Sequence, residues 1–426
     1  MWHGAGWCIR MKITGIASIA LFTVSLAPCE GELVVETFTP EAIRVMPADL
    51  PPPNEKESAN KRPEVVDVPE KASLFAPEGF TVELYAENVP DARWLAVTPD
   101  GGLLLTHGKG DRISLLRDTD GDGKPDKNET FADKTNKLNL PFGMAFAEGH
   151  FLVGNTDAVR RYPWKSGQLK LEGEGTEITK LPGKGYNQHW TRNVVASPDG
   201  GWVFVSVGSE SNVDAEEAPR ASVLKMKPDG SGRTVFAHGL RNPVGLAFHP
   251  ETQELFATVN ERDKLGDGLV PDYLTQVKEG GFYGWPYAYL SPGNLDPRRM
   301  KDGKSEKPEL AAKTLTPDLL FESHSAALGL AFPRGEMFPE KYRNGAFVAF
   351  RGSWNRNKGT GYKIVFVPFV DGRPSGHYED FIKGFLTDPE GPTTWGRPVG
   401  VIFLPDGSLV FSEESNGRLY RVTYKK

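Results

Sequence analysis

The chain has 426 residues, a net charge of −6 and 38% hydrophobic residues, with 47 glycines and 34 prolines. The negative balance offers no basic face for nucleic acid or for an anionic membrane. The abundance of glycine and proline favours an all-β protein with many turns.

The first 29 residues are predicted to be a signal peptide. Arg10 and Lys12 precede an apolar run over residues 13–27, which is short for a membrane span and typical of an export signal. We therefore expect a periplasmic or secreted protein with no membrane span after cleavage. Cys29 lies near the expected cleavage point, but Pro28 precedes it where a lipoprotein signal prefers a small residue, which argues against a lipid anchor.

Both cysteines of the chain, Cys8 and Cys29, lie in or beside this signal. The mature domain is therefore expected to contain no disulfide, although it is exported. The sequence also lacks the C-x-x-C-H pattern of covalently attached c-type haem.

Residues 30–73 follow the signal and are rich in charge and proline, with few aromatics. This composition predicts a disordered linker or tether. The folded domain is expected to span residues 74–426.

An acidic loop, RDTDGDGKPDKNET at residues 117–130, fits the calcium-loop pattern D-x-D-x-D-G-x5-E. The expected ligands are Asp118, Asp120, Asp122 and Asp126 through side chains, Lys124 through its carbonyl, and Glu129 at the twelfth position. The loop joins predicted strands instead of helices, so we expect a stabilising ion and no sensor role. The alternative is a solvated acidic turn without metal.

One unit recurs six times between residue 94 and the end of the chain. Each copy starts with an apolar step such as FGMAF, VGLAF or LGLAF, passes a turn that often contains PDG, and continues into an apolar strand. The second strands begin near residues 103, 151, 202, 254, 346 and 408. Such repeats indicate blades, so the predicted fold is an all-β, six-bladed β-propeller. A β-sandwich or two small β domains are the alternative.

Two further predictions concern the ends of the repeat array and the wide gap between its fourth and fifth copies. The terminal runs FTVELYAENV and GRLYRVTY are expected to pair and so to join the first copy to the last. An insertion at about residues 285–320, rich in turn formers and charge, is expected to form a surface loop beside the functional face.

Polar residues occur beside the first or second strands of several copies, where a propeller gathers its functional groups. They include His189, Arg241, Asn242, His324, Arg351 and Arg397. Arginines that converge on one mouth suit an anion with several carboxylates or phosphates. A histidine among them can act as a general base. Taken singly, each residue also has a structural interpretation, such as a salt bridge between blades for Arg241.

Several of these stretches together resemble the sorbosone dehydrogenase group of the soluble quinoprotein glucose and pyranose dehydrogenase superfamily. They are HGLRNPVGLAF, NERD, EGGFYGWP, NQHWTRNVVASPDGGWVFVSVGS and RGSWNR, and the resemblance covers residues 75–426. It implies a six-bladed propeller that binds pyrroloquinoline quinone and Ca²⁺ at its mouth. It also implies oxidation of an aldose, pyranose or sugar aldehyde by hydride transfer to the quinone. Without a haem motif, the electrons would pass to a separate cytochrome or soluble carrier.

The resemblance also implies roles for individual residues, with His189 as the general base. The residues expected to contact the cofactor are Arg241, Asn242, Arg351, Arg397, Arg192 and His324. Glu261 and Arg262 occupy positions whose carbonyls would hold a cofactor-side calcium ion. Two positions depart from the family pattern: Val399 replaces the second of two arginines, and Arg351 stands where lysine or histidine is usual.

Two other functions are compatible with the sequence. A calcium-dependent hydrolase of the lactonase type would hold its metal through Asn155, Asp157, Asn212 and Glu261, but this leaves the arginines without a partner. A non-catalytic binding propeller would account for the departures at Arg351 and Val399.

Overall fold

The structure is a computed structural model that describes residues 7–10, 25–28, 33–183 and 189–425. Most of the predicted signal peptide lies outside these residues. Its described parts form an antiparallel pair of strands, β1 (Trp7–Arg10) and β2 (Ser25–Pro28). Among the described residues, we find no helix whose length and apolarity would suffice for a membrane crossing.

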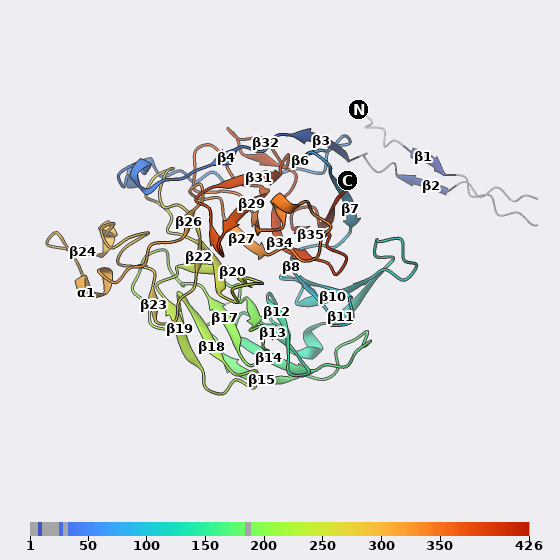
Figure 1. Cartoon of the computed structure of the whole chain (residues 1–426), viewed down its shortest axis with the longest axis horizontal. Helices are drawn as coiled ribbons and strands as arrows, with labels where there is room; N and C mark the ends of the chain where they lie inside the picture. The colour runs from blue at the N-terminus through green and yellow to red at the C-terminus, as the bar shows by residue number, and fades with distance from the viewer. Residues whose placement is uncertain (1–6, 11–24, 29–32, 184–188, 426) are drawn as a thin grey trace, which may run out of the picture.

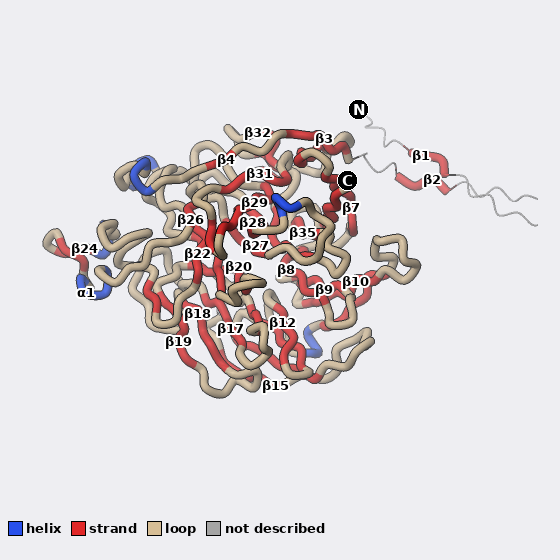
Figure 2. The backbone as a smooth tube through the Cα atoms, viewed as in Figure 1, coloured by secondary structure: helices blue, strands red, loops and turns tan. Residues whose placement is uncertain are grey.

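The all-β prediction is confirmed, because strands make up nearly all of the regular structure (Figure 2). In the described part of the chain, the single α-helix is α1 (Pro308–Ala311). The 3₁₀ turns are η1 (Pro47–Asp49), η2 (Glu55–Glu57), η3 (Lys134–Asn136), η4 (Pro297–Arg299) and η5 (Glu340–Tyr342).

Within the described residues, six sheets of at least four strands follow one another along the chain (Figure 1). The first contains β8 (Ala92–Val97), β9 (Leu103–His107), β10 (Arg112–Arg117) and β11 (Lys127–Ala132). The second contains β12 (Met144–Ala147), β13 (His150–Gly154), β14 (Ala158–Pro163) and β15 (Thr176–Lys180). The third contains β16 (Val194–Ala196), β17 (Val203–Val207), β18 (Ser222–Met226), β19 (Thr234–His238) and β23 (Gly281–Phe282).

The remaining three sheets continue the series. The fourth contains β20 (Asn242–Phe248), β21 (Leu255–Asn260), β22 (Tyr273–Gln276) and β26 (Leu319–Leu320). The fifth contains β27 (Ala327–Ala331), β28 (Gly345–Phe350), β29 (Lys363–Val370), β31 (Tyr378–Ile382) and β4 (Ala42–Ile43), with β30 (Arg373–Pro374) beside β29. The sixth contains β34 (Pro398–Phe403), β35 (Leu409–Glu413), β36 (Arg418–Tyr424) and β7 (Phe80–Ala86).

The predicted pairing of the two ends of the repeat array is confirmed. Strand β7 runs antiparallel to β36, with Thr81 opposite Thr423 and their hydroxyl oxygens 2.7 Å apart. The last sheet therefore takes its outer strand from the start of the domain, which leaves no free edge on β36.

The first strands of the six sheets meet at the centre of the molecule. They contact one another in the order β8, β12, β16, β20, β27 and β34, and β34 contacts β8 again. One apolar side chain from each sheet, or from the loop before it, fills the centre. These side chains belong to Trp94, Phe142, Trp190, Val244, Leu328 and Val399. The position of Val399 in this cluster gives a physical reason why an arginine is absent there.

Glycines in the first strands allow this approach. A β-carbon at Gly245 would lie 2.3 Å from the carbonyl oxygen of Leu328, and one at Gly329 would lie 2.4 Å from that of Val399. A β-carbon at Gly400 would lie 2.5 Å from the carbonyl oxygen of Arg93. The glycine of the recurring apolar step is thus required by the backbone of the next sheet.

Hydroxyl groups of the second strands form hydrogen bonds to both of the neighbouring first strands at these close contacts. The Thr258 hydroxyl accepts a hydrogen bond from the backbone of Gly245 (2.9 Å) and donates one to the carbonyl of Leu328 (2.7 Å). Ser412 does the same between Gly400 (2.8 Å) and Arg93 (2.6 Å). The register of both first strands shifts at these points, which is typical of a β-bulge.

Residues 33–72 correct the prediction of a disordered tether over residues 30–73. Strand β3 (Val34–Phe38) pairs with β6 (Ser73–Pro77), β4 pairs with β31, and β5 (Glu64–Val65) pairs with β33 (Thr393–Thr394). The composition of the segment does not show that strand edges elsewhere supply it with backbone partners. We call residues 33–72 the strap; its blue trace crosses the orange and red strands in Figure 1.

The predicted insertion contains only short elements, and part of it is buried. Its exposed hairpin consists of β24 (Met300–Lys301) and β25 (Lys304–Ser305). Trp285 is buried at its start, and Tyr287 and Ala288 belong to a small buried cluster, so the prediction of a surface loop holds only for the later part. A further short strand, β32 (Leu386–Asp388), pairs with β33 near the strap.

We predict that Gly329→Ala destabilises the protein by about 1–3 kcal/mol, because its β-carbon would force neighbouring first strands apart. Gly293→Ala is the matched control, since its nearest atom would be the Ser291 hydroxyl at 4.0 Å. Urea unfolding of both variants measures the difference. Equal midpoints would contradict the role assigned to these glycines.

Candidate functional site

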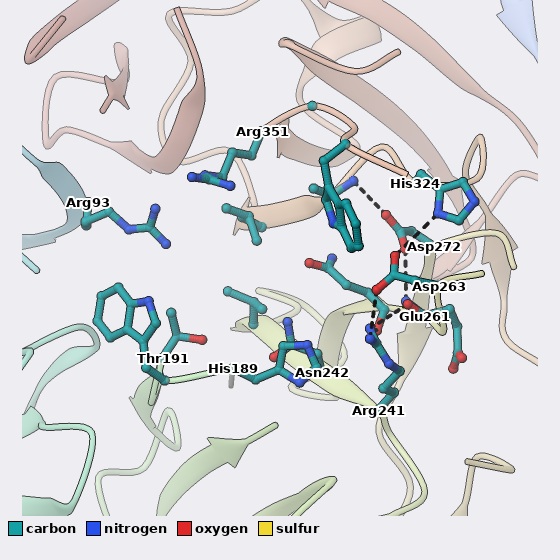
Figure 3. A pocket seen from close by; sticks show the side chains of 17 residues that line it. Arg93, His189, Thr191, Arg241, Asn242, Glu261, Asp263, Asp272, His324 and Arg351 are labelled. Carbon is teal, nitrogen blue, oxygen red and sulfur yellow. Dashed lines mark hydrogen bonds and ion pairs between the residues drawn. The ribbon is translucent and has the colours of Figure 1, made fainter. Parts of the chain in front are cut away.

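A cavity of about 320 Å³ opens beside the central apolar cluster (Figure 3). Trp190, Val244 and Leu328 of that cluster form part of its lining. Polar side chains from four of the six sheets, or from the loops next to them, form the rest. They include Arg93, His189, Arg241, Asn242, Glu261, Asp263, Asp272, His324 and Arg351. The structure therefore brings the predicted site residues His189, Arg241, Asn242, Glu261, His324 and Arg351 together at one cavity.

His189 presents an unprotonated ring nitrogen. Its backbone has a φ of 44°, and its Nδ1 lies 3.0 Å from the carbonyl oxygen of Ser209, which can only accept. Nδ1 is therefore the protonated nitrogen, and Nε2 has no hydrogen-bond partner among the described residues. Burial, reinforced by Arg241, lowers the pKa of His189 to about 3, so the ring is neutral at pH 7.

Arg192 does not line the cavity but holds His189 from behind. Its guanidinium donates to the carbonyls of His189 (2.7 Å), Thr191 (2.8 Å) and Pro182 (2.8 Å), and the residue is 1% exposed. Burial lowers its pKa to about 9. Arg192 was predicted to contact a cofactor, but its Nη1 and Nη2 donate to backbone carbonyls and the residue does not line the cavity.

Arg241 lines the cavity, but the protein itself occupies all three of its guanidinium nitrogens. They donate to the carbonyl of Asn212 (3.1 Å), the carbonyl of Glu261 (2.6 Å), the side-chain oxygen of Asn212 (3.0 Å) and the carboxylate of Asp263 (2.9 Å). Asn242, the next residue, differs: its Oδ1 is buried and has no hydrogen-bond partner in the described part of the chain. Of this predicted pair, the amide is therefore the group free to bind a ligand.

On the opposite side of the cavity, Arg93 and Arg351 share one carboxylate. Glu414 forms an ion pair with Arg93 through one oxygen and with Arg351 through the other. Burial alone would raise the pKa of Glu414, but Arg351 and Arg93 outweigh it and hold the pKa well below its usual range. Figure 3 shows Arg93 and Arg351 toward the left and the acidic residues Glu261, Asp263 and Asp272 on the right.

Arg397 also lies behind the cavity. It donates to the carbonyls of Arg351 (3.2 Å) and Gly352 (3.2 Å), and burial lowers its pKa to about 10. It therefore supports the backbone of Arg351 and does not itself reach the cavity, contrary to the predicted cofactor contact.

On the acidic side of the cavity, the pKa values of the carboxyl groups are shifted in opposite directions. Burial raises the pKa of Glu261 to about 8 and that of Asp272 to about 6. Burial also opposes the charge of Asp263, but Arg241 and His324 lower its pKa. His324 donates from Nε2 to the carbonyl of Gly266 (3.1 Å), and Asp263 raises its pKa against the effect of burial.

Arg262, whose carbonyl was predicted to hold a metal ion, does not line the cavity. Its side chain is 1% exposed, and it pairs with Asp296 (2.5 Å) and Glu55 (3.3 Å) away from the cavity. Its carbonyl lies 3.4 Å from the backbone nitrogen of Val270. Glu261 is different, since its Oε1 is buried at the cavity without a partner.

The acidic loop assembles only part of its predicted ligand set. Asp118, Asp120 and Asp122 bring carboxylate oxygens within 4.8 Å of one another. Asp126 instead accepts hydrogen bonds from the backbone (2.7 Å) and hydroxyl (2.6 Å) of Thr119. Glu129 pairs with Arg117 at 2.6 Å, and the Lys124 ammonium lies 4.0 Å from Glu83.

The set proposed for a lactonase-type metal is not assembled. Asn155 donates to the carbonyl of Lys137 (2.9 Å), Asp157 accepts from Asn139 (2.8 Å), and Asn212 is bonded to Arg241. Of the four residues, only Glu261 lines the cavity.

Sequence patterns did not single out three residues that line the cavity, Arg93, Asp263 and Asp272. They also did not identify Glu414, which pairs with Arg93 and Arg351. Arg93 had a usable signal, because it precedes an apolar first strand just as Arg241 and Arg397 do. Asp263 is the last residue of the NERD stretch, which carried the family resemblance as a whole. Asp272 and Glu414 have no such repeat position, and their roles depend on partners distant in sequence.

We predict that Glu261→Gln changes how stability depends on pH. The native Glu261 retains its proton up to about pH 8, whereas the unfolded side chain loses it near 4.5, so native wild type binds more protons in this window. Wild type should therefore lose stability relative to the variant as pH rises, by up to about 1.4 kcal/mol per pH unit. Urea unfolding between pH 5 and 8 measures this, and parallel curves would contradict it.

Comparison with known families and proteins places these observations in context. Residues 74–270 and 298–425 match the family described as TrAA12-like. An uncharacterized protein of Borreliella burgdorferi is 27% identical over 378 residues, which cover 83% of this chain and 92% of that protein. The pyrroloquinoline quinone-dependent pyranose dehydrogenase of Coprinopsis cinerea is 24% identical over 313 residues, 57% of this chain and 40% of that enzyme. The match therefore spans less than half of the pyranose dehydrogenase.

Solved structures show the same fold. The calcium structure of the Trichoderma reesei family AA12 protein has a TM-score of 0.71 at 20% identity and covers 85% of this chain and 98% of that one. The holo form of the pyranose dehydrogenase quinone domain from Coprinopsis cinerea has a TM-score of 0.68 at 17% identity, with 83% and 97% covered.

Proposed function

Because the chain belongs to the TrAA12-like family, as the resemblance in its sequence predicted, we propose that it is a pyrroloquinoline quinone-dependent enzyme that oxidises a sugar. The observation that carries this proposal is the arrangement of the cavity. A neutral histidine with a free Nε2 lies in it, next to an unpartnered amide and across from two arginines. An aldose, pyranose or sugar aldehyde is the proposed substrate class.

We propose in addition that the six sheets are the blades of a six-bladed propeller. The cyclic contacts of the first strands and the single apolar side chain from each sheet support this. Export through the N-terminal signal, and transfer of electrons to a separate carrier, belong to the same proposal.

The residues of the cavity fit the quinone cofactor. Its volume of about 320 Å³ is at the lower end of the range for small-molecule sites, roughly 300–1,000 Å³. The buried Nε of Arg93 and Oδ1 of Asn242 have no hydrogen-bond partner among the residues that the structure describes, so a ligand can bond to them without breaking a bond within the protein. Arg93 and Arg351 are the cations that would contact carboxylates of the cofactor. When bound, the quinone supplies a hydride acceptor for the sugar carbon.

A cofactor-side calcium ion fits the acidic side of the cavity in part. Ca²⁺ takes oxygen ligands, and Glu261 offers an unpartnered carboxyl oxygen there. Arg262, predicted to offer its carbonyl, does not line the cavity, and that carbonyl lies 3.4 Å from the backbone nitrogen of Val270.

His189 is the proposed general base. Its Nδ1 donates to Ser209, so Nε2 carries the lone pair that would take the hydroxyl proton of the sugar. Arg192 holds the backbone of His189, which keeps the ring in this orientation. Burial lowers the pKa of His189, so the ring is neutral at pH 7 and able to accept the hydroxyl proton.

We predict that the protein binds the quinone with Ca²⁺ and then reduces a dye acceptor when aldoses are added. His189→Ala should lower kcat by roughly 10²–10⁴-fold, the usual contribution of a general base, and retain quinone binding. Absorbance titration measures binding, and dye reduction measures turnover. His150→Ala is the control, because His150 bonds to the carbonyl of Glu148 outside the cavity. Full activity in His189→Ala would refute the base assignment, and a failure of wild type to bind quinone would favour a non-catalytic binding protein.

We propose that the acidic loop binds a stabilising Ca²⁺ through Asp118, Asp120 and Asp122. Removal of the ion by EDTA should lower the melting temperature by about 1–2 °C for each kcal/mol of binding free energy, the shift expected for a domain of this size. Asp120→Ala should abolish the EDTA effect, whereas Glu336→Ala, which removes an exposed carboxylate elsewhere, should preserve it. If EDTA leaves wild type unchanged, the loop is only a charged turn.

A further inference from the structure

The strap runs along the same end of the molecule as the cavity. Within residues 54–66 it bonds in turn to loops of the fourth, fifth and sixth sheets. The bonds are Asn54 N to Leu265 O (2.9 Å), Gly266 N to the Ser58 hydroxyl (3.0 Å), Lys61 N to Trp354 O (2.8 Å), Glu64 N to Pro392 O (2.9 Å) and Asn416 Nδ2 to Val66 O (3.0 Å). The strap precedes residue 74, where the family match begins.

Two of these loops are walls of the cavity, and Asn355 links them to the strap. Asn355 is 1% exposed; its Oδ1 accepts from the backbone of Lys264 (2.7 Å), and its Nδ2 donates to the carbonyl of Ala59. Lys264 follows Asp263, and Asn355 follows Trp354, and both of these neighbours line the cavity. One buried side chain therefore ties both walls to the strap.

Glu55 of the strap forms an ion pair with Arg262, which belongs to the wall that contains Asp263. Its carboxylate lies 3.3 Å from Nη2 of the buried Arg262 and 2.9 Å from Nε of Arg298. Arg262 stands between two cavity residues, Glu261 and Asp263. Asp296 is the other carboxylate on Arg262, so Glu55 completes the ion pairing of a guanidinium that is 1% exposed.

This part of the strap contributes little to the hydrophobic core. None of residues 54–66 is buried, and Val66 is the member of this stretch that packs against an apolar cluster of the described residues. Burial of apolar surface is the main source of folding stability, so the fold gains little from this stretch. Its contacts instead restrict the loops that carry Asp263 and Trp354.

We propose that Glu55 and residues 58–61 of the strap, acting through Asn355 and Arg262, position two walls of the ligand cavity and so set the affinity for what it binds. The proposal rests on the proposed function for the identity of the ligand. These are positioning residues, because they touch the walls and not the ligand.

The test compares Glu55→Gln and Asn355→Asp with Glu57→Gln. Glu57 lies two residues from Glu55 in the same exposed stretch, and its carboxylate has no bond to the described residues. With pyrroloquinoline quinone and Ca²⁺ as the probe, both test variants should raise Kd, and KM for aldoses, by about two- to thirtyfold, with kcat nearly unchanged. The unfolding midpoint of Glu55→Gln should match that of Glu57→Gln, because Asp296 still pairs with Arg262. Asn355→Asp places a buried carboxylate against the carbonyl of Ala59 and should have a lower midpoint. Equal Kd and KM in all three variants would overturn the proposal.

A second measurement needs no ligand. Hydrogen exchange at the backbone amides of Lys264 and Gly266, and of residues 353–357, should be faster in Glu55→Gln than in Glu57→Gln. Unchanged exchange would overturn the positioning role even if wild type binds the quinone. Faster exchange in a protein that binds no quinone would support the positioning role while the proposed function fails.

Discussion

The close approach of neighbouring first strands at the centre is the constraint on which the rest of the structure depends. At Gly245, Gly329 and Gly400 the backbone of the next sheet lies where a β-carbon would be. Hydroxyls of Thr258 and Ser412 bond to both strands across these contacts. Because backbones meet there, a single apolar side chain from each sheet suffices to fill the centre. The strand ends are thereby brought within side-chain reach of one another, and this creates the cavity.

The cavity is divided by charge, and burial explains how each charge is held. Arg93 and Arg351 flank one carboxylate on one side, while the other side carries three carboxyls beside Arg241. A buried ion without a partner is costly, so most guanidinium nitrogens here donate to a carboxylate or a carbonyl. The same burial keeps His189 neutral and Glu261 protonated near neutral pH. The residues that stay unpartnered, above all Asn242, are those a ligand can use.

Two segments outside the family match meet behind this cavity. The strap contributes Glu55, and the stretch between residues 271 and 297 contributes Asp296, and both carboxylates pair with the buried Arg262. Trp285 of the same stretch donates to the carbonyl of Asn212 at 2.9 Å. The central arrangement is thus shared with the family, whereas the outer walls of the cavity contain elements that lie outside the matched ranges.

The repeat, the all-β class and the residues that converge on the cavity could be predicted from the sequence, because turn residues and apolar strands recur at a spacing that does not depend on distant contacts. The direction of each side chain could not be predicted. Arg192 and Arg397 occupy repeat positions like that of Arg241, yet they bond to carbonyls behind the cavity. Glu414 pairs with Arg93 from 321 residues away, and the strap finds strand edges that its composition does not reveal. Only the tertiary structure decided these features, because a polar group's distant partner leaves no periodic pattern in the sequence.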